Sequence, residues 1–183
     1  MNYIEIIILN CIYILFPLFL YFLYFAYTKA FDKNTINTIL NFCVLSSFYL
    51  VLKFGPDNIL LRLLFLNIPI MLAYYYDKRI SALLLSTYMV IIYSHFSNTI
   101  LMYIIFEYTI SFFIKYKIKS PNIYTFIFII IKLVSIFILK YYFNAFKLIT
   151  FNELVIKFLI FGITSLICLA SLKKIKEIIK LEM

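Results

Sequence analysis

The sequence predicts an all-α, polytopic integral membrane protein, a bundle of six or seven transmembrane helices. Of its 183 residues, 66% are hydrophobic and only 14% are charged, and the mean hydropathy is +1.04. Because about 25% of the residues in a soluble domain are charged, this chain has too few charges to cover a water-facing surface. Seven crossings of roughly 20 residues each would use about 140 positions. The remainder is too short for a separate soluble domain.

Long apolar runs, separated by short polar connections, give the spans in chain order. The seven expected spans are 6–27, 36–52, 58–76, 80–94, 99–114, 123–139 and 153–172. Residues 173–183 follow as a basic helical tail. Spans 80–94 and 99–114 are short for a hydrocarbon core of about 30 Å. A helical hairpin that does not cross fully is therefore an alternative to these two crossings.

The first span, 6–27, differs from a secretory signal peptide, because it lacks a basic start and a small-residue cleavage site and is too long. We expect it to be retained as a crossing. It contains Pro17, and the third span contains Pro69 near its centre. Since proline removes a backbone hydrogen bond, we expect each to kink its helix. A kink of this kind can turn a carbonyl toward a cavity, although proline is also common in ordinary membrane helices.

The distribution of basic residues predicts the orientation. With the chain after the last span in the cytoplasm, the inner segments hold eleven basic residues: Lys29, Lys33, Lys78, Arg79, Lys115, Lys117, Lys119, Lys173, Lys174, Lys176 and Lys180. The outer connections then hold three, Lys53, Lys140 and Lys147. This excess obeys the positive-inside rule. We therefore expect a plasma-membrane protein whose N-terminus lies outside and whose C-terminus lies in the cytoplasm, provided that the number of crossings is odd.

Four ionisable side chains fall inside the predicted spans, where charge is costly and often functional. Arg62 and Lys157 lie about one turn from the outer ends of their spans, so both can extend to the interface. Glu107 and Lys132 lie about 10–12 Å below the outer boundary on consecutive spans, so their head groups can meet. Three interpretations follow: a static ion pair, a site for a polar ligand, proton or ion, or two charges that never meet.

A fifth titratable candidate is His95, the single histidine, in the connection between the fourth and fifth spans. Its imidazole could titrate near neutrality and sense pH, although a lone loop histidine more often has no such role. The candidates for a ligand or sensing site are thus Glu107, Lys132, Arg62 and His95.

The sequence carries no catalytic or metal-binding pattern. Cys11, Cys43 and Cys168 each lie in an apolar run without a CxxC or Cys/His spacing, so we expect small buried hydrophobes and no metal site or disulfide framework. GxSxG, HExxH, paired-aspartate and P-loop patterns are also missing. We expect neither an enzyme nor a cofactor. Because the basic residues lie between apolar runs, a nucleic-acid partner is excluded as well.

The C-terminal tail has apolar residues at Leu172, Ile175 and Ile179, a three-then-four spacing that starts a coiled-coil seam. One interpretation is a basic amphipathic end that lies on anionic lipid. The other is a signalling helix that pairs two copies of the chain and would normally continue into an output domain. The sequence stops after little more than one heptad, which suggests a severed or degenerate receptor.

Four short motifs of the chain carry a resemblance to a known family. They are Phe16-Pro17-Leu18-Phe19 in the first span, Gly55-Pro56 before the third, Ile68-Pro69 inside it, and the tyrosine run from Tyr74 to Arg79. With them, the chain resembles the multi-pass N-terminal sensing module of bacterial sporulation-type sensor histidine kinases and, more loosely, the receptor module of LytS-type kinases. The resemblance implies a receptor that signals through its last span to a cytoplasmic kinase. The chain departs from these families in having no kinase domain and few glycines.

We therefore expect a sensor or regulatory module that relays a signal through its last span to a cytoplasmic kinase or regulator, with a homodimer formed through the C-terminal helix. Glu107, Lys132 and Arg62 would form the sensing core. The alternative is a small transport component, such as a substrate-binding membrane subunit, or a membrane scaffold of cell-wall assembly. Two glycines in the whole chain argue against the closely packed small-residue interfaces of transporters.

Overall fold

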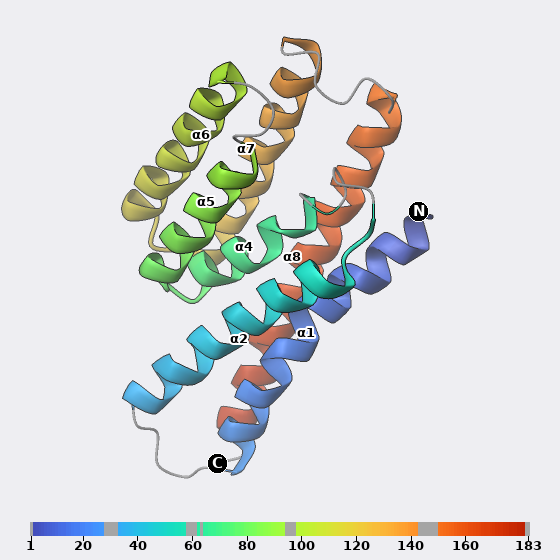
Figure 1. The fold of residues 1–183 in the computed structure, drawn as a ribbon. Helices are drawn as coiled ribbons and strands as arrows, with labels where there is room; N and C mark the ends of the chain where they lie inside the picture. Colours follow the sequence, from blue (N-terminus) through green and yellow to red (C-terminus); the bar gives the residue numbers. More distant parts are fainter. Residues whose placement is uncertain are drawn as a thin grey trace.

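The computed structural model describes residues 2–27, 33–57, 62, 64–93, 98–142 and 150–181, and the regular structure in this part of the chain is helical. The helices are α1 (Tyr3–Tyr27), α2 (Lys33–Phe54), α4 (Asn67–Tyr75), α5 (Arg79–Tyr93), α6 (Asn98–Lys117), α7 (Pro121–Tyr141) and α8 (Phe151–Leu181) (Figure 1).

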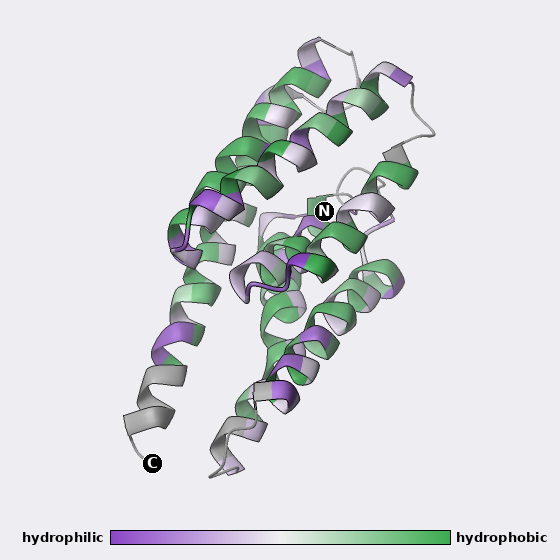
Figure 2. Ribbon diagram, turned by 90° about the vertical axis from the view of Figure 1, so that its left-hand side faces the viewer, coloured by the Kyte–Doolittle hydropathy of each residue, from purple (hydrophilic) through white to green (hydrophobic). Residues whose placement is uncertain are grey.

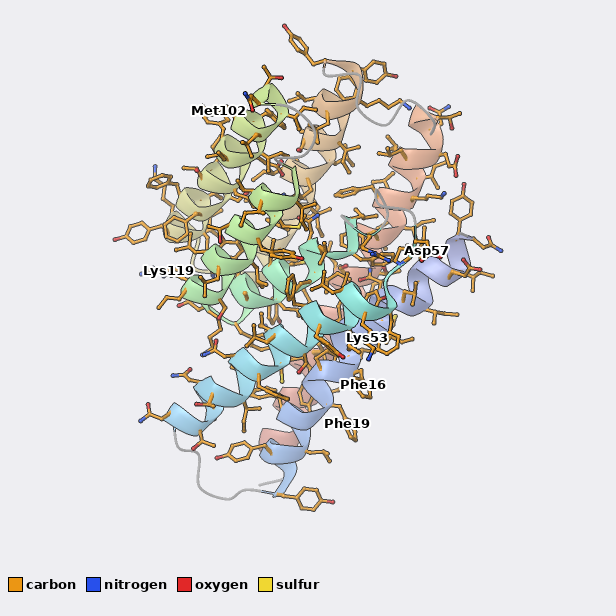
Figure 3. The ribbon with its side chains drawn as sticks, viewed as in Figure 1. Phe16, Phe19, Lys53, Asp57, Met102 and Lys119 are labelled. Atoms are coloured by element: carbon orange, nitrogen blue, oxygen red, sulfur yellow. The ribbon has the colours of Figure 1, made fainter. Side chains whose placement is uncertain are left out.

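Five helices in the described part are long and apolar enough to cross a membrane. Their spanning stretches are Tyr3–Tyr24, Asn34–Phe54, Asn98–Lys117, Pro121–Tyr141 and Asn152–Ile175. Hydrophobic residues occupy most of each of these helices (Figure 2). Many also face outward, as Phe16 and Phe19 do on α1 with exposed fractions of 66% and 58% (Figure 3). Apolar side chains on both the core side and the outer side are typical of a multi-pass membrane protein.

The third and fourth predicted spans have a different form from the other five. The part of span 58–76 that the structure describes includes α4, of nine residues, and α5 has fifteen. Neither reaches the roughly 20 residues of a full crossing. The hairpin alternative therefore applies to α4 and α5, whereas it was expected for spans 80–94 and 99–114. The second of those, α6, is a full-length helix of 20 residues.

Helix α4 lies at the centre of the bundle, where it packs against α1, α2, α5 and α7. Its residues from Asn67 to Tyr74 are all buried. A helix that is apolar around its whole circumference is suited to such a position. Around it, α8 packs against α1 and α7, and α1 and α8 run in the same direction (Figure 1).

Pro17 lies inside α1 without ending the helix. Its missing N–H leaves the carbonyl of Tyr13, four residues earlier, without an intrahelical partner. The buried Ser47 of α2 donates a hydrogen bond to that carbonyl over 2.8 Å. The polar group freed by the proline is therefore satisfied by a neighbouring helix, as a membrane interior requires.

At Pro69 the effect is larger than the expected kink. The helical residues are interrupted by a turn at Leu66, and Pro69 is the third residue of the helix that begins at Asn67. In this first turn a backbone N–H has no intrahelical acceptor, so proline costs nothing there. Pro69 thus lies in the first turn of α4, which forms the second half of the predicted third span.

Candidate functional site

The first candidate site is the intramembrane ion pair between α6 and α7. These helices are joined by residues 118–120 alone, so they are antiparallel neighbours and residues at equal depth face each other. Lys132 Nζ lies 2.6 Å from Glu107 Oε1, and both side chains are buried. The prediction that the two head groups meet is confirmed.

Both charges of the pair have further partners. Ser135 donates a hydrogen bond to the second carboxylate oxygen of Glu107 over 2.5 Å. The ammonium group of Lys132 lies 3.7 Å from the ring centroid of Tyr108, a cation–π contact. Tyr108 in turn donates to Asn67 Oδ1, at the start of α4, over 3.1 Å. The pair therefore connects α6, α7 and the central helix.

This arrangement is a closed one. The lining of the cavity described below includes neither Glu107 nor Lys132, and each charge is already satisfied by the other and by its neighbours. A proton or ion site needs a route for its ligand, so the geometry favours a static pair that fixes α6 against α7. Such a pair can be neutral for net stability while the loss of one partner is costly.

The other predicted candidates lie elsewhere. Arg62 Nε donates to the carbonyl of Pro56 over 3.0 Å, and its guanidinium lies 3.9 Å from Asp57. It therefore holds the turn after α2, and the structure gives it no contact with the Glu107–Lys132 pair. Lys157 pairs with Glu153, one turn earlier on α8, over 2.5 Å. His95 lies outside the described residues.

The predicted C-terminal seam is partly used inside the chain. Leu172 is 3% exposed and belongs to the hydrophobic core, so it is not free to pair with a second copy. Ile175 is 41% exposed, and the side chain of Ile179 lies outside the described residues. The assignment of Leu172 to a seam between two copies was therefore wrong, because the hydrophobic core of the chain extends along α8 as far as this residue.

The cysteines were expected to be small buried hydrophobes. In the structure all three are free thiols, but Cys11 Sγ of α1 and Cys168 Sγ of α8 lie 3.5 Å apart. Beside them, Asn10 donates to the carbonyl of Phe161 and to Ser165 Oγ over 2.8 and 2.9 Å. These contacts join the first and last helices of the bundle.

A second candidate site was missed by sequence reasoning. It is a cavity of about 800 Å³ at the end of the bundle where α2 begins and α6 ends, and we call it the basic mouth. Its lining comes from α1, α2, α4, α5, α6, α7 and the two connections between α4 and α5 and between α6 and α7. The lining residues are Tyr21, Ile36, Leu40, Tyr75, Tyr76, Asp77, Arg79, Lys115, Tyr116, Ile118, Lys119 and Pro121.

The charges of the basic mouth surround one carboxylate. Arg79 Nε donates to Asp77 Oδ1 over 3.2 Å, and the buried Lys115 Nζ lies 3.9 Å from the same oxygen. The guanidinium of Arg79 also lies over the ring of Tyr116, 5.6 Å from its centroid. Lys119 is exposed at the rim, at the far left of the view in Figure 3.

Asp77 is held in this position by the end of α4. Its φ of 57° is left-handed, a conformation that is uncommon for residues other than glycine. The N–H of Asp77 donates to the carbonyl of Tyr74 and that of Lys78 to the carbonyl of Ala73, over 3.2 and 2.7 Å. This is the pattern of a Schellman helix end. An aspartate at the position that glycine usually takes is the local feature that directs its carboxylate between Arg79 and Lys115.

Lys78 ties this turn to the start of α2, because its ammonium donates to Asn37. Partial burial lowers the pKa of Lys78 from its ordinary value, and the negative charge of Asp77 opposes that shift. In sequence, the residues of the basic mouth were visible only as Asp77-Lys78-Arg79 and the lysines at 115, 117 and 119. Their basic residues indicated the orientation, and the first group also belonged to the tyrosine run of the resemblance, but neither predicted a cavity.

Comparison with protein-family models, with curated proteins and with solved structures finds no match for this chain.

Proposed function

We propose that this protein is a multi-pass sensor or regulatory module of the plasma membrane, and that it relays a change at the basic mouth through α8 to a cytoplasmic partner. The observation that carries the proposal is a contact of Tyr75. This residue lines the basic mouth, and its hydroxyl donates to the carbonyl of Leu169 on α8 over 3.4 Å. A change in the cavity therefore has a direct route to the last helix.

The proposed orientation places the basic mouth on the cytoplasmic side. It is supported by the positive-inside rule together with the contacts that gather Lys78, Arg79 and Lys115 at one end of the bundle. We take α4 and α5 as two short passages within the bundle, which together with the five long helices make seven. The support is that their connection, at Asp77 and Lys78, contacts both the start of α2 and the end of α6.

Helix α8 is suited to the relay because it runs unbroken for 31 residues, from Phe151 to Leu181. It packs against α1 and α7, so a shift of α8 must change both interfaces. A ligand moves such an equilibrium only by its difference in affinity for the two arrangements. Tyr75 supplies that difference if its hydrogen bond to Leu169 holds in one arrangement and breaks in the other.

A pair of tyrosine variants tests the relay. Tyr75→Phe removes the hydroxyl and keeps the ring, and Tyr76→Phe is its matched control on the same wall of the cavity. We expect a spin label at the exposed Lys174 of α8 to change mobility in Tyr75→Phe and to stay as in the wild-type chain in Tyr76→Phe. A Tyr75→Phe spectrum identical to that of the wild-type chain would remove the basis of the proposal.

The identity of the partner tests the class of function. The full chain is purified from its native membrane, and bound proteins and metabolites are identified by mass spectrometry. A histidine kinase or response regulator in near-stoichiometric amount is the expected result. Recovery of a tightly bound small molecule together with an ATPase would instead identify a transport component.

A further inference from the structure

We infer that the basic mouth binds the phosphate group of an anionic phospholipid. The inference rests on the proposed function, since it names the ligand class of the same cavity. The lining carries the three cations Arg79, Lys115 and Lys119 and the single carboxylate Asp77, which leaves an excess of two positive charges.

Lys115 is the side chain that most needs an additional anion. It is 6% exposed, and a buried ammonium group is costly unless an anion compensates it. Among the described residues the facing carboxylate is Asp77, at the long distance of 3.9 Å, and that carboxylate also accepts a hydrogen bond from Arg79. One shared carboxylate therefore only partly compensates two cations, and a phosphate between them would complete the pairing.

The donor groups match phosphate in chemistry. A guanidinium presents several N–H groups in a fixed fork, and an ammonium adds a compact charge, so arginine and lysine together are a common phosphate-binding set. The Schellman end of α4 fixes Asp77, and with it the position of Arg79. The cations are therefore oriented by the fold before a ligand arrives.

The remaining lining favours a lipid over a free phosphate ion. The volume of about 800 Å³ is within the range of sites for complete small molecules and is far larger than one phosphate. The lining also includes the apolar side chains of Ile36, Leu40 and Ile118. A cavity lined by both cationic and apolar side chains fits an amphipathic molecule with a phosphate at one end. The cavity also lies at the ends of membrane-spanning helices, where phospholipid head groups are concentrated.

The test measures retained lipid by native mass spectrometry of the full-length chain in detergent. Phosphatidylglycerol is the anionic probe, phosphatidylcholine the zwitterionic probe and inorganic phosphate the free anion. We expect one phosphatidylglycerol per chain in preference to phosphatidylcholine. Lys115→Met and Arg79→Gln should each weaken this binding at least tenfold, whereas Lys117→Met, at the same end of α6 but outside the cavity lining, should change it less than twofold.

Three results would overturn the inference: equal retention of the two lipids, equal effects of Lys115→Met and Lys117→Met, or binding of inorganic phosphate with no lipid retained. Asp77→Asn adds a further readout, because it removes the competing carboxylate. Phosphatidylglycerol binding should be kept or strengthened in that variant, and its loss would also contradict the inference. The binding assay needs no partner and no signal in α8. A failure to bind lipid is therefore distinguishable from a failure of the relay, which the Tyr75→Phe spectrum reports.

Discussion

Several polar side chains inside this bundle are paired across helices, which removes them from lipid. Ser47 satisfies the carbonyl that Pro17 leaves open, and Ser135 donates to the Glu107 carboxylate. Each such group would cost several kcal/mol if it faced hydrocarbon alone. At the scale of single residues, these polar groups therefore lie where a neighbouring helix can receive them.

The Glu107–Lys132 pair gives the sharpest prediction at this scale. Glu107→Gln should lower the free energy of unfolding in detergent by about 3–5 kcal/mol, because it leaves the Lys132 ammonium buried without its counter-ion. Combining Glu107→Gln with Lys132→Gln should recover part of that loss. Combining it with Lys117→Gln, which changes an exposed lysine of the same helix, should recover none. If the effects of Glu107→Gln and Lys132→Gln are simply additive, the two charges are not coupled.

At the scale of the helices, close approach depends on a few small residues. A Cβ at Gly162 of α8 would lie 2.7 Å from Ile129 Cγ2 of α7, a distance shorter than real contacts allow. The small Ser165 lies about one turn later on the same helix and accepts a hydrogen bond from Asn10 of α1. The close approach of α7 and α8 at Ile129 thus requires a residue without a Cβ at position 162.

Gly162→Ala should therefore destabilise the bundle by about 1–3 kcal/mol, since the added methyl group overpacks the α7–α8 interface. The double variant with Ile129→Ala should be more stable than the sum of the two single effects, because the smaller side chain makes room for the new methyl group. Thermal unfolding of the purified variants in detergent measures both effects. Ala170→Val, on an exposed position of the same helix, is the control for added bulk, and a loss of equal size there would refute the packing argument.

The helices differ in how far the sequence could predict them. Long apolar runs predicted α1, α2, α6, α7 and α8. Helix α6 extends beyond the predicted residues 99–114, because the apolar part of a lysine side chain, such as that of Lys115, allows the helix to continue past the apolar run. A kink at Pro69 was predicted, but the exact place of the break, at Leu66, was not, since the residues there are as apolar as the rest of the run. The Glu107–Lys132 contact could be predicted because a short connection fixes the depth of two neighbouring helices. The basic mouth could not, because its lining comes from elements far apart in the sequence.

For the molecule as a whole, three features bear on the proposed relay. The basic mouth lies at one end of the bundle, and the Glu107–Lys132 pair is buried between α6 and α7. Helix α8 packs against both α1 and α7. A cytoplasmic basic mouth is the claim that connects them, because the lipid-binding inference and the relay through α8 both place their chemistry at that face. Helix α6 reports on this claim directly, since it links the two ends of the bundle in 20 residues.

The decisive measurement is the accessibility of single cysteines at the start of α6 and just after its end, Asn98→Cys and Lys119→Cys, both at exposed positions. The three native cysteines are replaced by alanine, and the chain is treated with a membrane-impermeant maleimide in intact cells and in inverted vesicles. The account predicts that Asn98→Cys reacts only in cells and Lys119→Cys only in inverted vesicles. Reaction of both from one side would show that α6 does not cross the membrane, and the reversed pattern would place the basic mouth outside the cell.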